Sequence, residues 1–113
     1  MVTIDQFTRR TYQVGTGPFR FYKRPRVWCR DGFNISIQGG EGSYSTPRKN
    51  VQEFMAMECG YPNRVEELIL EFAEDQANPT ETVYCWVPID IIQQVIDKHG
   101  GIDIDRTFLS LAE

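Results

Sequence analysis

The 113-residue sequence lacks most of the features that reveal a function directly. Its longest apolar stretches are far shorter than the ~20 residues that a membrane-spanning helix needs. The first residues, Met1-Val2-Thr3-Ile4-Asp5-Gln6, have neither the basic start nor the apolar run of a signal peptide. No internal repeat is present. We therefore expect a single domain over residues 1–113, with no membrane span, in the cytoplasm.

The sequence also contains little of what common catalytic and metal sites require. It has one histidine, His99, and none of the G-x-S-x-G, H-E-x-x-H or Walker patterns. The cysteines, Cys29, Cys59 and Cys85, are odd in number and widely spaced, which argues against a disulfide framework and against a paired C-x-x-C metal site. We expect buried reduced thiols, no metal and no cofactor. No catalytic residue is predicted, and an enzyme is the less favoured interpretation.

The composition is that of a globular protein, with 41% hydrophobic, 25% charged and 12% aromatic residues and a formal net charge of -4. The charge is unevenly placed along the chain. Residues 1–50 hold nine basic against three acidic residues (+6), and residues 51–113 hold three against thirteen (-10). Such asymmetry can mark a basic or an acidic binding surface. It also arises when the two halves face each other in the fold, and both interpretations stay open.

Residues 19–38 predict a β-hairpin around Asp31-Gly32. A three-residue loop, with the glycine in the left-handed conformation, places Val27 opposite Ile35. A two-residue loop would mix apolar and polar residues on both faces, so we predict the three-residue loop. The residues that this register gathers on one core-facing side are Val27, Cys29, Phe33, Ile35 and Ile37.

Two longer helices are predicted in the second half of the chain. Asn63 is a good N-cap for a helix over 63–75, in which apolar residues recur at i, i+3, i+4 and i+7. These apolar residues are Val65, Leu68, Ile69 and Phe72. Pro88 suits the first turn of a second helix over 88–99. A protonated His99 would interact favourably with the C-terminal end of that helix, and we favour this capping role over that of a general base.

The remaining segments complete an α+β fold. Thr3-Ile4-Asp5-Gln6 has the pattern of a capping box, which predicts a short helix from Thr3. Strand patterns lie near 51–58, where the imperfect alternation also allows a helix, and over 82–87. The tail after Ile102 is apolar enough to dock on the domain. The predicted architecture is a small antiparallel sheet (hairpin 19–38 plus strands near 51–58 and 82–87) packed with two main helices (63–75 and 88–99).

The polar face of the first hairpin strand is the clearest functional feature. Arginine binds phosphates and carboxylates and stacks on rings, and tryptophan and tyrosine supply stacking planes. The predicted binding residues are Arg20, Tyr22, Arg24, Arg26, Trp28, Arg30, Arg48 and Lys49. In the alternative interpretation, the arginines only prevent edge-to-edge pairing of an edge strand, and the N-terminal helix covers Trp28.

Short segments over most of the chain share a further pattern. They include Ser45-Thr46-Pro47-Arg48, Gly60-Tyr61-Pro62, Phe72-Ala73-Glu74-Asp75, Trp86-Val87-Pro88 and Lys98-His99-Gly100-Gly101. Together they resemble segments of a family of small tailed-bacteriophage (phage and prophage) proteins. The resemblance brings no catalytic residues. It implies a protein of the bacterial host cytoplasm that binds and disables a host or defence component.

The first functional hypothesis is therefore an accessory binding protein that engages and inhibits a host or defence-system macromolecule. Its contact surface would be the basic strand face or the acidic face of the helix over 63–75. The alternative is a protein that binds or sequesters a nucleotide or nucleic acid through the basic-aromatic face. The net negative charge argues against nonspecific DNA binding. A homo-oligomer is also left open, because Trp28 or the tail after Ile102 could bury against a second copy.

Overall fold

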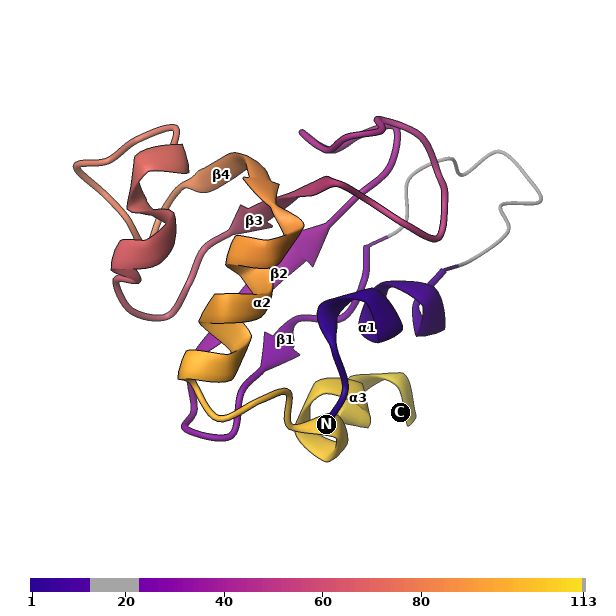
Figure 1. Cartoon of the computed structure of the whole chain (residues 1–113). Helices are drawn as coiled ribbons and strands as arrows, with labels where there is room; N and C mark the ends of the chain where they lie inside the picture. Colours follow the sequence, from indigo (N-terminus) through magenta and orange to yellow (C-terminus); the bar gives the residue numbers. More distant parts are fainter. Residues whose placement is uncertain (13–22, 113) are drawn as a thin grey trace.

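The computed structural model describes residues 1–12 and 23–112 (Figure 1). Its elements in chain order are α1 (Ile4–Arg10), β1 (Val27–Trp28), β2 (Asn34–Gln38), β3 (Ala56–Gly60), the 3-10 helix η1 (Glu67–Phe72), β4 (Val83–Pro88), α2 (Ile89–Lys98) and α3 (Ile104–Ala112). The four strands form one antiparallel sheet in the order β1-β2-β3-β4. The predicted α+β fold is confirmed.

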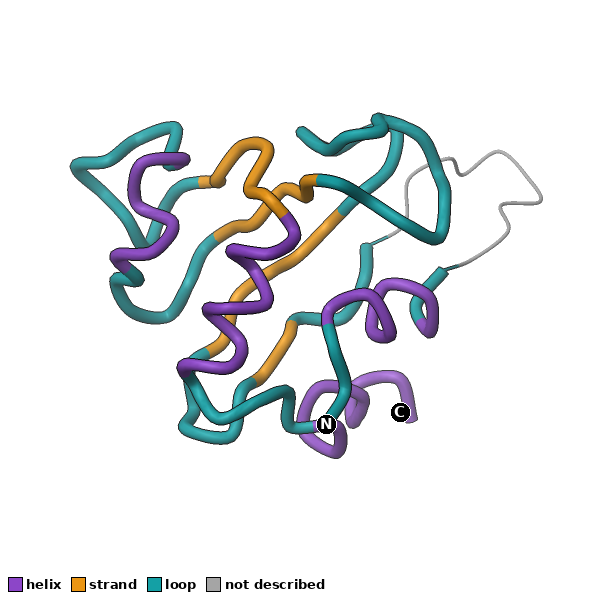
Figure 2. Tube along the Cα trace, in the orientation of Figure 1, coloured by secondary structure: helices purple, strands orange, loops and turns teal. Residues whose placement is uncertain are grey.

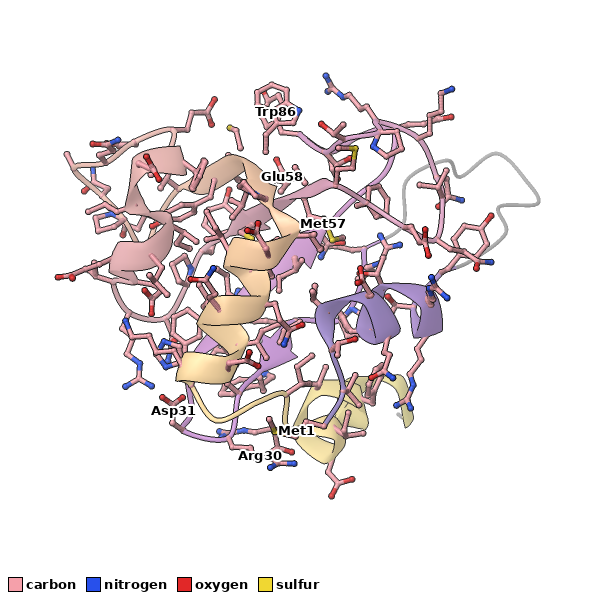
Figure 3. All side chains as sticks on the ribbon, in the orientation of Figure 1. Met1, Arg30, Asp31, Met57, Glu58 and Trp86 are labelled. Atoms are coloured by element: carbon pink, nitrogen blue, oxygen red, sulfur yellow. The ribbon has the colours of Figure 1, made fainter. Side chains whose placement is uncertain are left out.

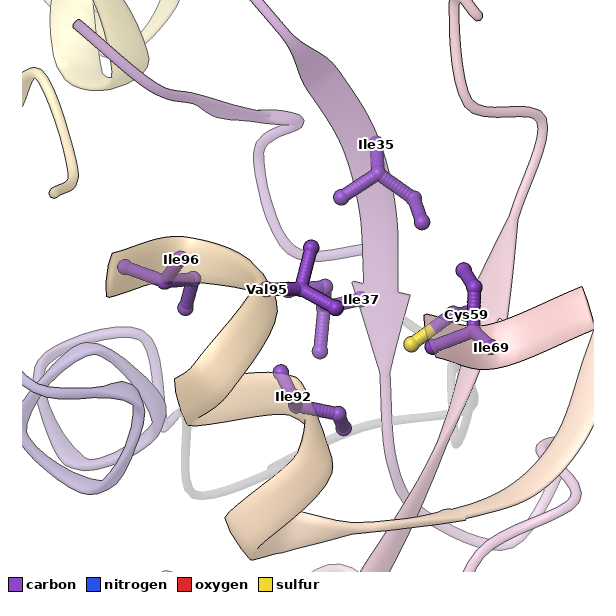
Figure 4. Close-up of a pocket in the computed structure, with 7 residues that line it drawn as sticks. All are labelled: Ile35, Ile37, Cys59, Ile69, Ile92, Val95 and Ile96. Carbon is purple, nitrogen blue, oxygen red and sulfur yellow. The ribbon is translucent and has the colours of Figure 1, made fainter. Parts of the chain in front are cut away.

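Helix α2 lies across one face of the sheet, and α1 and α3 lie beside the β1 end (Figures 1 and 2). The core forms between α2 and the sheet, where apolar side chains surround a cavity of about 10 Å³ (Figure 4). The lining side chains are Ile35, Ile37, Cys59, Ile69, Ile92, Val95 and Ile96. The lining offers a water molecule no polar partner, and the space is small, so the core is closely packed at this point.

The hairpin has the predicted register. Val27 pairs with Ile35, and the Cys29 N–H donates to the Phe33 carbonyl at 2.8 Å. Gly32 has the expected left-handed backbone, with φ 95°. All five side chains of the predicted core-facing set are buried. Turn chemistry and hydrophobic alternation were therefore sufficient to predict this pairing.

The capping box at the N-terminus is also confirmed. The Gln6 N–H donates to Thr3 Oγ1 at 3.1 Å, and the Thr3 N–H donates to Gln6 Oε1 at 2.9 Å. The strand predicted over 82–87 corresponds to β4, and the helix predicted over 88–99 corresponds to α2. Gly100 follows that helix with φ 90°, as its place after the C-cap residue His99 requires.

The third strand begins later than the pattern near 51–58 predicts. Met55 lies before β3, and its N–H donates to the Thr46 carbonyl at 2.7 Å while its carbonyl accepts from the Ile89 N–H at 3.0 Å. These bonds connect it to a loop and to the start of α2. Regular pairing with β2 starts only further along, at Glu58, opposite Gln38.

The α-helix predicted over 63–75 is wrong, because only the short η1 forms there. Asn63 is not an N-cap, since its side chain accepts from the Asn34 N–H at 2.9 Å and donates to the Gly32 carbonyl at 3.2 Å. The bond to the Leu68 N–H is instead made by Glu66, at 2.8 Å. Of the predicted apolar face, Val65 (54%) and Leu68 (38%) are exposed.

Main chain covers both edges of the sheet. At β1, Cys29 bridges to Ile102, and the Asp103 N–H donates to the Trp28 carbonyl at 2.8 Å. At β4, Ala73 bridges to Tyr84. Arginine side chains are therefore not needed to block edge pairing, and the tail after Ile102 docks as predicted. Within residues 1–12 and 23–112, no helix is both long and apolar enough to cross a bilayer.

Candidate functional site

The structure does not gather the predicted basic-aromatic residues on one open face. Arg20 and Tyr22 lie outside the described residues. Arg24 is only 3% exposed, which corrects its expected place on a solvent-facing surface. Its Nε donates to Thr11 Oγ1 at 2.9 Å, and its guanidinium donates to the Gly39 carbonyl at 2.9 Å. Arg24 therefore connects α1 to the end of β2.

Arg26 and Trp28 lie against the protein. Arg26 Nε donates to Asn34 Oδ1 at 2.5 Å, and its guanidinium also donates to the Tyr61 carbonyl. Burial lowers the pKa of Arg26 from its ordinary value. Trp28 is covered by α3 rather than by the N-terminal helix, since the guanidinium carbon of Arg106 lies 3.9 Å from its ring centroid. Neither side chain is presented as a free stacking or anion-binding group.

The last three predicted residues are exposed, but Arg30 lies apart from Arg48 and Lys49. Arg30 is near the N-terminus, where its guanidinium lies 3.8 Å from the Met1 sulfur. Arg48 and Lys49 belong to the loop between β2 and β3. Of these, Arg48 joins an aromatic group that the sequence pattern did not indicate.

That group is the aromatic cluster, which we define as Tyr44, Arg48 and Trp86. The Tyr44 and Trp86 rings are tilted by 48° with centroids 5.1 Å apart. The Arg48 guanidinium carbon lies 5.3 Å from the Tyr44 ring centroid. Trp86 is 48% exposed and projects from β4 (Figure 3). Exposed tryptophan, tyrosine and arginine side chains that pack on one another are typical of the contact residues of protein interfaces.

The backbone at Trp86 is strained. Its φ is 49°, a conformation that a bulky non-glycine residue rarely adopts. This conformation lies in a β-bulge of β4. Tyr84 pairs with Cys59 and Val87 pairs with Met57, so between these two pairs β4 has one residue more than β3. The Trp86 N–H donates to the Tyr44 carbonyl at 3.1 Å, so the loop holds the bulge in place. The bulge directs the indole away from the sheet.

A small cleft lies on the sheet face opposite α2, next to the aromatic cluster. Its volume is about 70 Å³, and its lining includes Lys23, Ser36, Glu58, Gly60, Tyr61 and Val83. Strand pairing builds the floor, since Ser36 pairs with Gly60. The Ser36 hydroxyl accepts from Gln38 Nε2 at 3.0 Å, which fixes its position. The floor is thus preorganised by the register of β2 and β3.

Glu58 is the carboxylate of this cleft. Burial raises its pKa above the ordinary value, and the charge of Glu74 acts in the same direction. A hydrogen bond from the Tyr44 N–H and the charges of Arg48 and Lys23 oppose that rise without cancelling it. A carboxylate that is costly to ionise and lies in a concavity is a candidate binding group. Figure 3 shows Glu58 beneath Trp86, on the same end of the molecule.

His99 is held between two carboxylates at the opposite end of α2. Its Nδ1 lies 2.6 Å from Asp31 Oδ2, and its Nε2 lies 2.8 Å from Glu66 Oε1. The ring stacks on Phe33 with centroids 4.1 Å apart. Lys98 Nζ lies 2.9 Å from Glu66 Oε1. We name Asp31, Glu66, Lys98 and His99 the histidine clamp.

The clamp is suited to holding the fold rather than to acid–base chemistry. Both ring nitrogens already face carboxylates, so neither is free to accept a proton from a substrate in this arrangement. Burial alone would raise the pKa values of Asp31 and Glu66, but hydrogen bonds from backbone N–H groups and from His99 lower both. No sequence signal pointed to these partners, which lie 68 and 33 positions from His99.

The cysteines and acidic residues form no evident metal site. Within the described part of the chain, no three His, Cys, Asp or Glu side chains are placed to hold a metal ion. The three thiols are free, with Cys29 and Cys59 buried. Burial raises the pKa of Cys29 to about 12, which makes it unreactive at neutral pH. Comparisons of this chain with protein-family models, with curated proteins and with solved structures found no match.

Proposed function

We propose that the protein is a binding protein whose contact surface is the aromatic cluster together with the adjoining cleft. The observation that carries the proposal is Trp86, which is about half exposed, packed against Tyr44 and directed outward by a strained bulge. Burying an aromatic side chain that is already held in place contributes much to the binding free energy and costs little conformational entropy. Strain that persists at an exposed tryptophan is better explained by contact with a partner than by folding alone.

The resemblance to small tailed-bacteriophage proteins supports a more specific role. It suggests an accessory protein that engages and inhibits a host or defence-system macromolecule in the bacterial cytoplasm. The absence of a free ring nitrogen at His99 fits a role in binding rather than in catalysis. The target would then be a protein that accepts Trp86 in an apolar pocket.

Substitution of Trp86 tests the proposal. We expect Trp86→Ala to abolish co-purification of a partner from a bacterial lysate, as read by native mass spectrometry, without lowering the melting temperature. Leu68→Ala, which removes another exposed apolar side chain (38%), is the matched control and should retain the partner. Retention of the same partner by Trp86→Ala would sink the proposal.

A nucleotide or nucleic acid is the second candidate ligand. Arg48 is exposed near the Tyr44 ring and is followed in the chain by the exposed Lys49, so a base could stack on Trp86 while a phosphate meets these cations. In Trp28→Phe the only remaining tryptophan is Trp86, whose fluorescence would report stacking directly. Quenching by oligonucleotides that weakens steeply with salt would favour this candidate. Unchanged fluorescence would count against a nucleic-acid ligand and leave a protein partner as the favoured interpretation.

A further inference from the structure

We infer that the cleft is a pocket for one basic side chain of the partner, with an alkyl stem along Gly60 and Val83 and a cationic head against Glu58. This inference rests on the proposed function, because the partner that covers Trp86 would supply the side chain. The group bound in the cleft would be the alkylammonium of a lysine or the alkylguanidinium of an arginine.

The shape of the cleft depends on Gly60. A Cβ built on this residue would meet Val83 Cγ1 at 3.6 Å and Ser36 Cβ at 4.0 Å, which are ordinary contact distances. A side chain at this position would therefore occupy the cleft rather than collide with its walls. The missing side chain opens a narrow space between Ser36, Tyr61 and Val83. The volume of about 70 Å³ suits a chain of a few methylene groups, not a ring.

The chemistry of the cleft depends on Glu58. The surface that lines the cleft around Glu58 is mostly apolar, and the nearby polar side chains of Ser36 and Gln38 are hydrogen-bonded to each other. One hydrogen bond from the Tyr44 N–H does not offset the cost of burying the charge. A cation brought into the cleft would offset more of it, whereas an anion would add a second negative charge.

Lys23 is a cation that acts against the proposed ligand, although it lowers the pKa of Glu58 less than the Tyr44 N–H and Arg48 do. It lines the same cleft and carries the same charge as the proposed ligand. Arg48 also acts on Glu58 from the aromatic cluster. The partner's cation must therefore compete with the chain's own cations, and removing Lys23 should strengthen binding. An anionic ligand would respond in the opposite way, which makes Lys23 a diagnostic position.

The cleft and the aromatic cluster adjoin, because Tyr44 of the cluster is hydrogen-bonded to Glu58, which lines the cleft. Its ring packs on Trp86, its carbonyl accepts from the Trp86 N–H, and its N–H donates to the Glu58 carboxylate. A partner segment that covers Trp86 would thus pass over the mouth of the cleft. We expect its basic residue to lie within a few positions of the residues that contact the indole.

The test uses small probes on the whole isotope-labelled protein. We expect n-butylammonium chloride to shift the amide resonances of Gly60, Tyr61 and Val83 saturably, while n-butanol at the same concentration does not. Glu58→Gln should weaken this binding about tenfold or more, and Lys23→Ala should strengthen it about threefold. Glu81→Gln, which removes the charge of an exposed carboxylate outside the cleft, is the matched control.

Two outcomes would overturn the inference: equal shifts with n-butanol, or unchanged n-butylammonium binding in Glu58→Gln. Gly60→Val, with a side chain that suits a strand, should block the probe even if Glu58→Gln proves unstable. Trp86→Ala separates this inference from the proposed function. If Trp86→Ala still captures the partner while n-butylammonium binds as expected, the proposal that the aromatic cluster is the contact surface fails. The inference that the cleft binds a basic group then remains.

Discussion

At the scale of single residues, the arginines and the histidine acquire roles that their local sequence does not indicate. Arg24 and Arg48 look alike in the sequence, yet Arg24 is buried with its guanidinium bonded to Gly39, and Arg48 is exposed on the aromatic cluster. His99 lies at a helix C-terminus as expected, and its ring joins the hairpin loop to the chain before η1. Each role depends on which distant groups lie within a few ångströms.

The histidine clamp predicts a pH dependence of stability. The pKa values of Asp31 and Glu66 are lowered in the folded state, so both carboxylates stabilise the fold above their unfolded pKa values of about 4. That stability is lost as the pH falls through their folded pKa values. We expect the free energy of unfolding, from urea titrations, to decrease between about pH 5 and pH 2.

Glu66→Gln isolates the buried member of this pair. We expect it to cost about 1–3 kcal/mol at neutral pH, because Lys98 and His99 lose a charged acceptor, and to flatten the acid-side slope. Glu67→Gln, at the exposed neighbouring position, should change neither quantity. An acid-side slope identical to that of the wild type would contradict a role for the clamp.

At the scale of elements, the segment over 63–75 shows how tertiary bonds can replace a helical pattern. Its apolar spacing is that of an amphipathic α-helix, but Asn63 bonds to the hairpin and Glu66 bonds into the histidine clamp. With its first residues committed to other partners, the segment forms only η1. Ile69 reaches the core, whereas Val65 and Leu68 stay exposed.

Asn63→Ala tests this explanation. We expect a loss of about 1–2 kcal/mol in the free energy of unfolding, since the Asn34 N–H loses its side-chain acceptor and the Gly32 carbonyl keeps only the Asn34 side chain of its two side-chain donors. Amide hydrogen exchange should rise in both the hairpin loop and residues 63–66. Asn78→Ala, in an exposed turn, is the control. Faster exchange confined to residues 63–66 would show that the two segments are not coupled.

At the scale of the whole molecule, the chain covers its own sheet edges and only partly pairs its two charged halves. Arg9 pairs with Glu53, and Asp31 pairs with Arg64, so some charges of residues 1–50 do meet those of 51–113. The acidic residues of η1 and the following turn remain exposed, as do Arg48 and Lys49. The charge asymmetry therefore survives folding in part.

The covered edge of β1 gives a prediction at this scale. Truncation after Gly101 removes the Ile102 bridge and α3, which exposes the main chain of β1 and the ring of Trp28. We expect red-shifted tryptophan fluorescence and concentration-dependent association in size-exclusion chromatography. The red shift should be absent when the truncation is combined with Trp28→Phe. A monomeric truncated protein with unchanged fluorescence would contradict the role given to α3.

Local sequence patterns were sufficient to predict the features that depend on neighbours along the chain. The capping box at Thr3, the left-handed Gly32, the hairpin register and helix α2 all follow from local hydrogen bonds and from hydrophobic alternation. The α+β class followed from these elements together.

The candidate site, in contrast, depends on contacts between segments that are distant in the sequence. Tyr44, Glu58 and Trp86 come from a loop and two strands, and they meet because of a bulge in β4 and a loop bonded to its edge. The burial of Arg24 and the partners of His99 were likewise decided by contacts between distant segments. Local patterns report whether a residue favours water or the core, whereas partners across the fold depend on chain packing, which no short window of sequence contains.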